Sequence, residues 1–258
     1  MLLSCGSRRL VSVSRRAKSV VPVEGGRALR QDESFFSEGT IMDASQDYLQ
    51  PPGGWLMTQT ERLPAPPPAR RGVLFRSVSG VARWFGRQEL PRVFPVFNIN
   101  RRLFWPWLLF ASQMMPFGRL PAPLREMLIL RTGWLCRSRY EWGQHVEIAL
   151  RVGVTHEQIV ALATAPHSLP EPATAVALQA CEELCQQQLI SETTWQTLSE
   201  YFKPRELVEI ILLVGHYQMV AGLLINSGVQ LEPSIENALD AFNQRAEALA
   251  GNPRESLS

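Results

Sequence analysis

The chain has 258 residues, of which 45% are hydrophobic and 19% charged, and its formal net charge is +2. This length and composition are typical of a globular protein with a sizeable core. The near-neutral charge gives no reason to propose nucleic acid as a partner. We find no apolar run that predicts a membrane span, so we expect no membrane partner.

The cysteines favour a reducing compartment. Cys5, Cys136, Cys181 and Cys185 form no Cys-x-x-Cys pair and no zinc-binding spacing. We therefore predict no metal site, and a cytoplasmic location is the default. Cys181 and Cys185 lie one helical turn apart in an apolar stretch and are interpreted as core residues or an ordinary thiol pair.

Residues 1–71 differ in composition from the rest. The first 23 residues contain five basic residues and no acid, and this pattern resembles a mitochondrial transit peptide. A disordered basic tail, or a true start at Met42 or Met57, is the simpler interpretation and the one we favour. The proline-rich stretch 63–71 predicts a stiff, extended linker.

Residues 72–103 predict a lead-in arm before the main domain. Residues 73–85 could form a short amphipathic helix. Residues 92–100 are apolar but interrupted by Pro95, and could form an extended arm over a neighbouring helix or subunit.

From residue 104 to 250 the sequence predicts an all-α domain. Apolar residues recur at helical spacing, and proline, glycine or serine marks the helix ends. The predicted helices are 104–115, 124–136, one from Ser138 to Gly153, one from Thr155, 172–188, 192–202, 205–225 and 234–249.

The stretch Pro123–Val154 contains the only dense cluster of chemically capable side chains. Ser138, Glu141 and His145 are spaced i, i+3 and i+7, so they share one helix face. Glu126 lies on the preceding helix and approaches His145 if the two helices pack antiparallel. A buried carboxylate–imidazole pair of this kind is a general acid–base unit.

Two capping boxes are predicted from the same region. Ser138 and Glu141 have the spacing in which the serine hydroxyl and the glutamate each bind the other's backbone N–H. Thr155 and Gln158 repeat this pattern at the next helix.

These residues resemble a known family. Glu126, Ser138-x-x-Glu141 and His145, followed by Ala149 and Gly153, resemble the core of the carboxymuconolactone decarboxylase-like superfamily, which includes the AhpD alkylhydroperoxidases. The run Tyr140-Glu141-Trp142-x-x-His145 resembles one uncharacterised branch of it. The resemblance covers residues 104–249. It implies an AhpD-like helical bundle that assembles into trimers, hexamers or related rings, with a dimer as a further option.

The chain departs from the peroxidase branch at two positions. In that branch a Cys-x-x-Cys pair precedes the histidine, and these positions are Ser138 and Glu141 here. The resemblance therefore does not carry over the peroxidase mechanism, which needs a nucleophilic thiolate and a resolving thiol. Cys136 could in principle react, but a small buried residue at a helix end is the simpler interpretation.

A partial internal repeat predicts two pseudo-repeated helical hairpins. Residues 124–126 are echoed by residues 204–206, and residues 151–154 by residues 226–229. We expect the first copy to hold the site and the second to act as scaffold. Tyr217 and Asn226 match a Tyr…Asn pattern of the branch and could line the same pocket.

Each candidate site residue also has a structural interpretation. His145 could be a buried core residue, Glu141 a capping residue only, and Tyr140 a packing residue. Arg131 could bind a substrate carboxylate or pair with a neighbouring acid.

The function that we predict is a cofactor-independent acid–base enzyme acting on a small organic acid or lactone, as implied by similarity to carboxymuconolactone decarboxylase. His145 would be the acid–base group, Glu126 its orienting carboxylate, and Arg131 or Tyr140 a substrate contact. The alternatives are a weakened thiol peroxidase that uses Cys136 and a non-catalytic oligomeric helical protein.

Overall fold

A computed structural model of the chain describes residues 47–72, 75 and 89–251. The basic stretch of residues 1–46 lies outside this part, and so does the helix predicted at 73–85, apart from Phe75. The predicted division of the chain at residues 71/72 and 103/104 remains a prediction.

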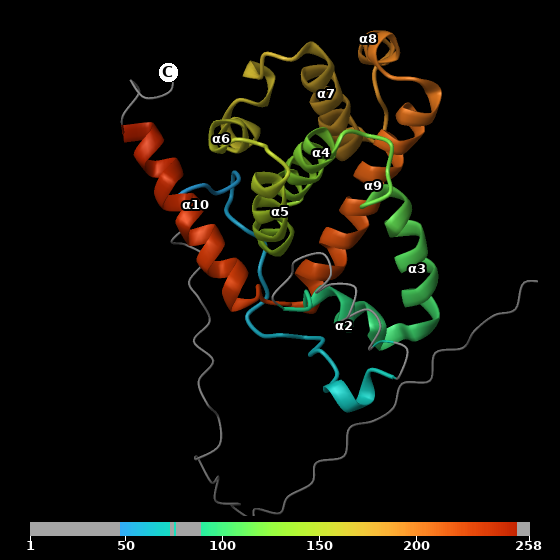
Figure 1. The fold of residues 1–258 in the computed structure, drawn as a ribbon, viewed down its shortest axis with the longest axis vertical. Helices are drawn as coiled ribbons and strands as arrows, with labels where there is room; N and C mark the ends of the chain where they lie inside the picture. Colours follow the sequence, from blue (N-terminus) through green and yellow to red (C-terminus); the bar gives the residue numbers. More distant parts are fainter. Residues whose placement is uncertain (1–46, 73–74, 76–88, 252–258) are drawn as a thin grey trace, which may run out of the picture. The chain divides into compact units, whose positions relative to one another are not determined.

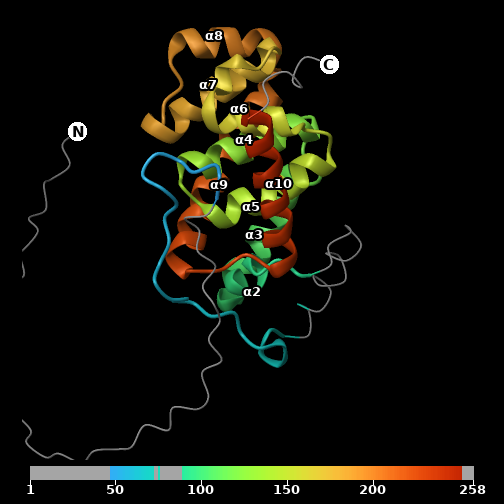
Figure 2. The same cartoon turned by 90° about the vertical axis from the view of Figure 1, so that its left-hand side faces the viewer.

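The prediction of an all-α bundle is confirmed, and the described residues contain no strand. Helix α4 packs against α5, α7 and α9, while α10 packs on α5 and α6 (Figures 1 and 2). Helix α8 lies beyond α7 at one end of the bundle in both views. The elements in chain order are η2 (Pro68–Arg70), α2 (Val93–Phe97), η3 (Asn98–Asn100), α3 (Arg101–Met114), α4 (Ala122–Leu135), α5 (Arg139–Arg151), α6 (His156–Thr164), η4 (Pro166–Ser168), α7 (Pro172–Gln187), α8 (Glu192–Tyr201), α9 (Pro204–Ser227) and α10 (Pro233–Gly251).

Helix α4 is buried on nearly every side. From Leu124 to Trp134 every residue except Arg131 is buried. A helix enclosed in this way must bury its polar side chains too, and such groups need partners or a change of charge. The two neighbouring buried polar residues Arg125 and Glu126 are therefore candidate functional residues.

The turn between α4 and α5 follows the Schellman pattern. Ser138 N–H donates to Gly133 O at 2.8 Å, and Arg137 N–H donates to Trp134 O at 3.0 Å. In this pattern the residue after the C-cap has a left-handed conformation and is usually glycine. Here that residue is Arg137, with φ 59°. The Arg137 side chain donates from Nε to Gly54 O at 2.6 Å and also binds Gly53 O.

The predicted capping boxes have opposite outcomes. The box of Thr155 and Gln158 is confirmed at the start of α6. The box of Ser138 and Glu141 is wrong, because the Ser138 side chain makes no capping hydrogen bond. Since the Schellman turn already uses the Ser138 N–H, the Glu141 carboxylate is not needed there.

The prediction of an extended arm at residues 92–100 is also wrong. Val93–Phe97 is a helical turn and Asn98–Asn100 continues it as η3. Pro95 is tolerated because it occupies the third position of the helix, where a backbone N–H has no acceptor within the helix.

The internal repeat takes a different form in its two copies. In the first copy α4 and α5 form a hairpin, whereas in the second α9 runs unbroken from Pro204 to Ser227. The second copy has no counterpart of the left-handed turn at Arg137, so its helix continues.

Residues 47–63, which we call the strap, lie against this domain. Asp47 binds Arg139 at 2.7 Å, and Arg139 also binds Glu236 at 2.7 Å, with all three side chains buried. The Trp55 ring packs edge-on against Trp134, with ring centres 5.5 Å apart. Further bonds join Leu56 N–H to Arg137 O, and Arg62 and Leu63 N–H to Ser227 O. Sequence analysis placed these residues in a tail and linker and did not predict their contacts.

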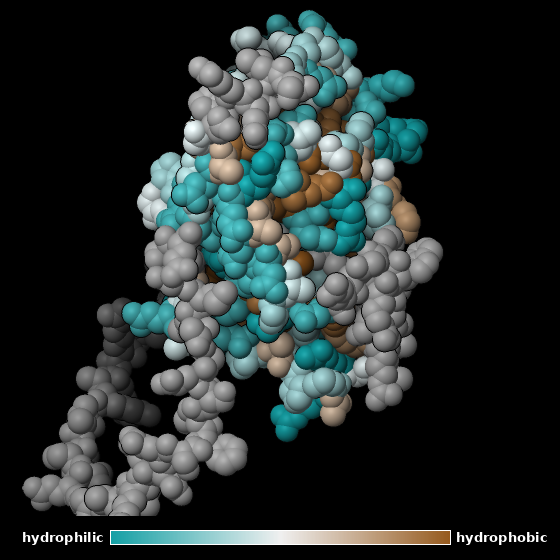
Figure 3. All heavy atoms as spheres, turned by 60° about the vertical axis from the view of Figure 1, so that its left-hand side comes forward, coloured by the Kyte–Doolittle hydropathy of each residue, from teal (hydrophilic) through white to brown (hydrophobic). Residues whose placement is uncertain are grey.

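By length and composition alone, helix α9 is long and apolar enough to cross a membrane. Of its most apolar stretch of 18 residues, 39% is buried. Its contacts with α4, α5, α7 and α3 show that one side of it belongs to the bundle. The face of the domain shown in Figure 3 is mostly hydrophilic, with hydrophobic side chains gathered in a smaller patch.

The buried ion cluster yields a prediction about stability. Arg139→Ala should lower the free energy of unfolding by about 3–5 kcal/mol, because Asp47 and Glu236 would stay buried without a counter-charge. Urea unfolding followed by circular dichroism measures this. The control is Arg151→Ala on the same helix, whose pair with Glu147 is more exposed and should contribute less than about 1 kcal/mol. Equally small losses in both variants would contradict a structural role for the cluster.

Candidate acid–base site

The centre of the site is the contact between Glu126 and His145. Oε2 of Glu126 lies 2.7 Å from Nδ1 of His145. Glu126 is fully buried and His145 is 7% exposed. A carboxylate on Nδ1 fixes the orientation of the ring and leaves Nε2 to exchange a proton with a substrate. The packing of α5 antiparallel to α4 produces this contact, as the sequence predicted.

Arg125 completes the pair from the next position on α4. Its Nε donates to Oε1 of Glu126 at 3.2 Å, and its side chain is only 7% exposed. The two oxygens of Glu126 therefore have different partners, the guanidinium on one side and the imidazole on the other. Arg125 is not predicted from the sequence, since consecutive residues of a helix are not expected to share a face.

Helix α9 supplies an aromatic wall to the site. The ring of Tyr217 packs edge-on against His145, with ring centres 5.1 Å apart. Burial raises the pKa of Tyr217 well above its usual value, and the charges of Glu126 and Glu141 add to this effect. Its hydroxyl therefore stays protonated, and its predicted place beside the site agrees with the geometry.

His216 is the neighbour of Tyr217 but belongs to the packing between α9 and α3. Its ring stacks on Trp107, with ring centres 6.1 Å apart. Burial lowers the pKa of His216 to about 4, so it is neutral at physiological pH. His216 therefore supports the wall rather than carrying charge into the site.

Glu141 is a second buried carboxyl group in a very different environment. Neither of its oxygens has a hydrogen-bond partner among the described residues. It lies against Gly133, where a side chain on residue 133 would be 3.4 Å from its Cγ and Oε1. Burial raises its pKa well above the usual value, with a smaller contribution from Cys185. A carboxyl group in such a place is held in its neutral form and can donate a hydrogen bond.

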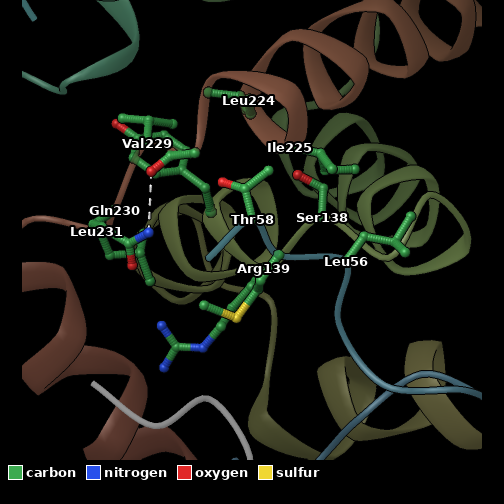
Figure 4. A pocket seen from close by; sticks show the side chains of 12 residues that line it. Leu56, Thr58, Ser138, Arg139, Leu224, Ile225, Val229, Gln230 and Leu231 are labelled. Atoms are coloured by element: carbon green, nitrogen blue, oxygen red, sulfur yellow. Dashed lines mark hydrogen bonds between the residues drawn. The ribbon is translucent and has the colours of Figure 1, made fainter. Parts of the chain in front are cut away.

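Ser138 lines a small cavity beside this helix end. The cavity has a volume of about 30 Å³, room for a water molecule, and lies among the strap, the start of α5 and the end of α9. Figure 4 shows the Ser138 hydroxyl among Leu56, Thr58 and Leu224. That hydroxyl is buried and has no hydrogen-bond partner among the residues that the structure describes. The cavity does not include Glu126 or His145, so we do not identify it with the acid–base site.

The thiols lie near Glu141 but are poorly suited to nucleophilic chemistry. Burial raises the pKa of Cys136 to about 12, with a smaller contribution from Glu141. The pKa of Cys185 is also raised, first by its hydrogen bond with Cys181 and then by burial. Cys181 lies 3.4 Å from the hydroxyl of Thr132 and is fully buried. The thiols of Cys136 and Cys185 therefore remain protonated at neutral pH.

Three predicted site residues lie elsewhere. Arg131 binds Glu182 at 2.7 Å and Leu162 O at 2.7 Å, so the pairing interpretation is the one that the geometry supports. The Tyr140 hydroxyl donates to Glu232 at 2.9 Å and accepts from the Val93 N–H. Asn226 is exposed and binds Gly222 O. In the described part of the chain, no three His, Cys, Asp or Glu side chains converge as metal ligands would.

The environment of Glu141 predicts a pH dependence of stability. The folded protein holds Glu141 protonated, whereas the unfolded chain ionises it near the ordinary pKa of 4.5. Its stabilising contribution is complete below that pH and is lost as the pH rises toward the folded-state pKa. Over this range the free energy of unfolding should fall by up to about 1.4 kcal/mol per pH unit.

Urea unfolding at a series of pH values measures this slope. Glu141→Gln should flatten it, because glutamine has no proton to lose. The comparison rests on the slope rather than on absolute stability, since the substitution alters the buried contacts as well. Identical pH profiles for the two proteins would contradict a protonated Glu141.

Comparison with known proteins identifies the fold. Residues 102–183, from α3 into α7, match the model of the carboxymuconolactone decarboxylase family. No curated protein sequence matches the chain. An uncharacterized peroxidase-related protein from Silicibacter sp. TM1040 is similar in structure, with a TM-score of 0.61 and 14% identity over 69% of this chain and 95% of its own.

Two further solved structures share the fold. The debrominase Bmp8 has a TM-score of 0.61 and 14% identity over 72% of this chain and all of its own. The AhpD core of a peroxidase-related protein from Ralstonia eutropha JMP134 has a TM-score of 0.61 and 17% identity over 67% of this chain and 93% of its own. The matched family segment contains both Glu126 and His145. Residues 102–183 are therefore similar to the carboxymuconolactone decarboxylase family, and the chain shares its fold with AhpD-like proteins.

Proposed function

We propose that the protein is a cofactor-independent acid–base enzyme that acts on a small organic acid or lactone. The observation that carries this proposal is the 2.7 Å contact between Glu126 and His145 inside the bundle. A histidine that served only in packing would not need a buried carboxylate on one nitrogen and a buried arginine behind that carboxylate.

Each group has a role that follows from its surroundings. Nε2 of His145 takes a proton from a carbon or oxygen of the substrate, or returns one to it. Glu126 stabilises the imidazolium that forms, and Arg125 balances the charge of Glu126 before the proton moves. In a decarboxylation, the carboxylate leaves as carbon dioxide and the electron pair left on carbon receives the proton from His145.

Glu141 suits the complementary role of a neutral acid. Electrons released to a substrate carbonyl make its oxygen more negative, and a protonated carboxyl group can donate a hydrogen bond to that oxygen. Glu126 and Glu141 are both near enough to Tyr217 to raise its pKa when they are ionised. Their contrasting environments supply a charged pair and a neutral acid in one site.

The proposal predicts the effect of changing the central pair. His145→Gln should lower kcat by at least about 100-fold, because glutamine cannot carry a proton. Glu126→Gln should lower it less, because Nε2 remains while its orientation and charge partner are lost. The assay follows carbon dioxide release and deuterium uptake from solvent, with a panel of lactone carboxylates that includes carboxymuconolactone and of 3-oxo acids.

The control is His156→Gln, which removes a histidine that stacks on Phe242 away from the site. It should retain full turnover, and circular dichroism should show that all three variants are folded. Turnover that is unchanged in His145→Gln would refute the catalytic role and favour a non-catalytic helical protein.

The alternative of a thiol peroxidase yields a prediction of its own. With a pKa of about 12, only about one Cys136 in 10⁵ is a thiolate at pH 7. Cys136→Ser should therefore leave the rate of peroxide consumption, measured with an external thiol, the same as in the unaltered protein. A large loss of peroxide consumption in this variant would support the peroxidase instead.

A further inference from the structure

The outward side of α9 is apolar where a surface helix is usually polar. Val208, Leu212 and Met219 are 56%, 45% and 50% exposed. No charged residue occurs between Glu209 and Glu232. Large exposed apolar surfaces of this kind mark interaction sites. The question is what covers this one.

The spacing of the exposed residues fits a helix as the partner. The outward positions follow one another at intervals of 4, 3, 4, 3 and 4 residues, which is the spacing of a helix–helix seam. Gly215 and Gly222 occupy two of these positions, and an added Cβ at either would meet nothing within 4 Å. Glycines on a seam let a second helix come close, whereas they give nothing to a lipid surface. The seam consists of Val208, Leu212, Gly215, Met219, Gly222 and Asn226.

We propose that a second copy of this chain docks on this face, with the two α9 helices antiparallel about a twofold axis near residue 217. In that register Leu212 faces Gly222 of the other copy, and Met219 faces Gly215. Val208 faces Asn226 at the two ends. Each bulky apolar residue in the middle of the seam thus meets a glycine, so the face is complementary to itself, as a twofold contact requires.

The parallel arrangement lacks this complementarity. Every residue of the seam would face its own copy, so methionine would meet methionine and glycine would meet glycine. The crowded and empty layers would both weaken packing. The antiparallel register alone gives layers of similar volume along the whole seam.

Charge does not oppose the contact. His216 borders the seam but is neutral, with its pKa lowered by burial to about 4. The carboxylate of Glu209, at the N-terminal end, accepts hydrogen bonds from the backbone N–H groups of Arg119 and Leu120. In the antiparallel register Glu209 faces the uncharged Ile225 of the other copy, so like charges do not meet.

Helix α3 widens the apolar surface beside the seam. Phe110 contacts His216, with ring centres 5.7 Å apart, which places it next to α9. Phe110 itself is 45% exposed, and Leu109 of the same helix is 68% exposed. The seam alone extends about 27 Å along α9. A helix pair of this length with apolar flanks is a sufficient core for a dimer contact.

The first test measures the mass of the protein in solution by sedimentation and light scattering at micromolar concentration. The unaltered chain should have an even number of copies. Leu212→Glu should weaken the contact by at least about 100-fold, because the twofold axis would bury two carboxylates, and the mass should halve. The control is Leu189→Glu, which changes another exposed leucine outside the seam and should keep the original mass.

A second test examines the register. Gly215→Met should break the contact, because the new side chain meets Met219 of the other copy. The monomer should remain folded, because the space beyond Gly215 is open. Adding Met219→Gly to this variant should restore the contact, because the large and small partners are then only exchanged. A double variant that stays monomeric would contradict the pairing of Gly215 with Met219.

Several results would overturn the proposal: a monomeric unaltered chain, an odd number of copies, or a mass that Leu212→Glu and Gly215→Met leave unchanged. Flotation with phosphatidylcholine–phosphatidylserine vesicles covers the membrane alternative. A chain that is monomeric in solution and floats with vesicles through this face would identify lipid as the occupant. The test does not depend on the chemistry of Glu126 and His145, so it can fail while the proposed function stands.

Discussion

The turn between α4 and α5 is the constraint on which the candidate site depends. Glu126 and His145 meet only because α5 returns along α4 after three residues, Cys136 to Ser138. That return requires a left-handed residue, and an arginine in this conformation is strained by about 1–2 kcal/mol. The hydrogen bonds from Arg137 to Gly53 and Gly54 offset the strain. A segment far away in the chain thus supports the geometry of the acid–base pair, and the strap is part of the folded domain for a physical reason.

The same turn explains why the two carboxyl groups of the site differ. Glu126 lies in the middle of α4, within reach of a guanidinium and an imidazole. Glu141 lies on the first turn of α5 against Gly133, where burial is complete and no partner is within hydrogen-bond distance in the described structure. Burial without a partner favours the neutral form, whereas opposite charge favours the ionised one. One hairpin therefore supplies two carboxyl groups with opposite chemical capacities.

The helices and the central pair could be predicted from the sequence, because both follow from local spacing. Apolar periodicity located the helices, and a short break between two of them placed Glu126 near His145. The wrong predictions concerned the turn and the contacts between helices, which depend on tertiary structure. Arg137 is not a glycine, so nothing in the sequence marked the left-handed turn, and the Ser138–Glu141 spacing was then misread as a capping box. The sequence also could not show which of Arg131 and Arg125 belongs to the site. Only the packing of α7 shows that Arg131 is already bound to Glu182.

Helix α9 shows why hydropathy alone could not separate its two faces. It is apolar on nearly every side, so the sequence indicates burial throughout. Its inner side supplies Tyr217 to the site, while its outer side carries the exposed seam. The only sequence signal of the difference is the pair Gly215 and Gly222, since glycine in the middle of a helix is unfavourable unless close approach requires it. A second helix on that seam would press on the side of α9 opposite Tyr217, which would hold the aromatic wall of the site against His145.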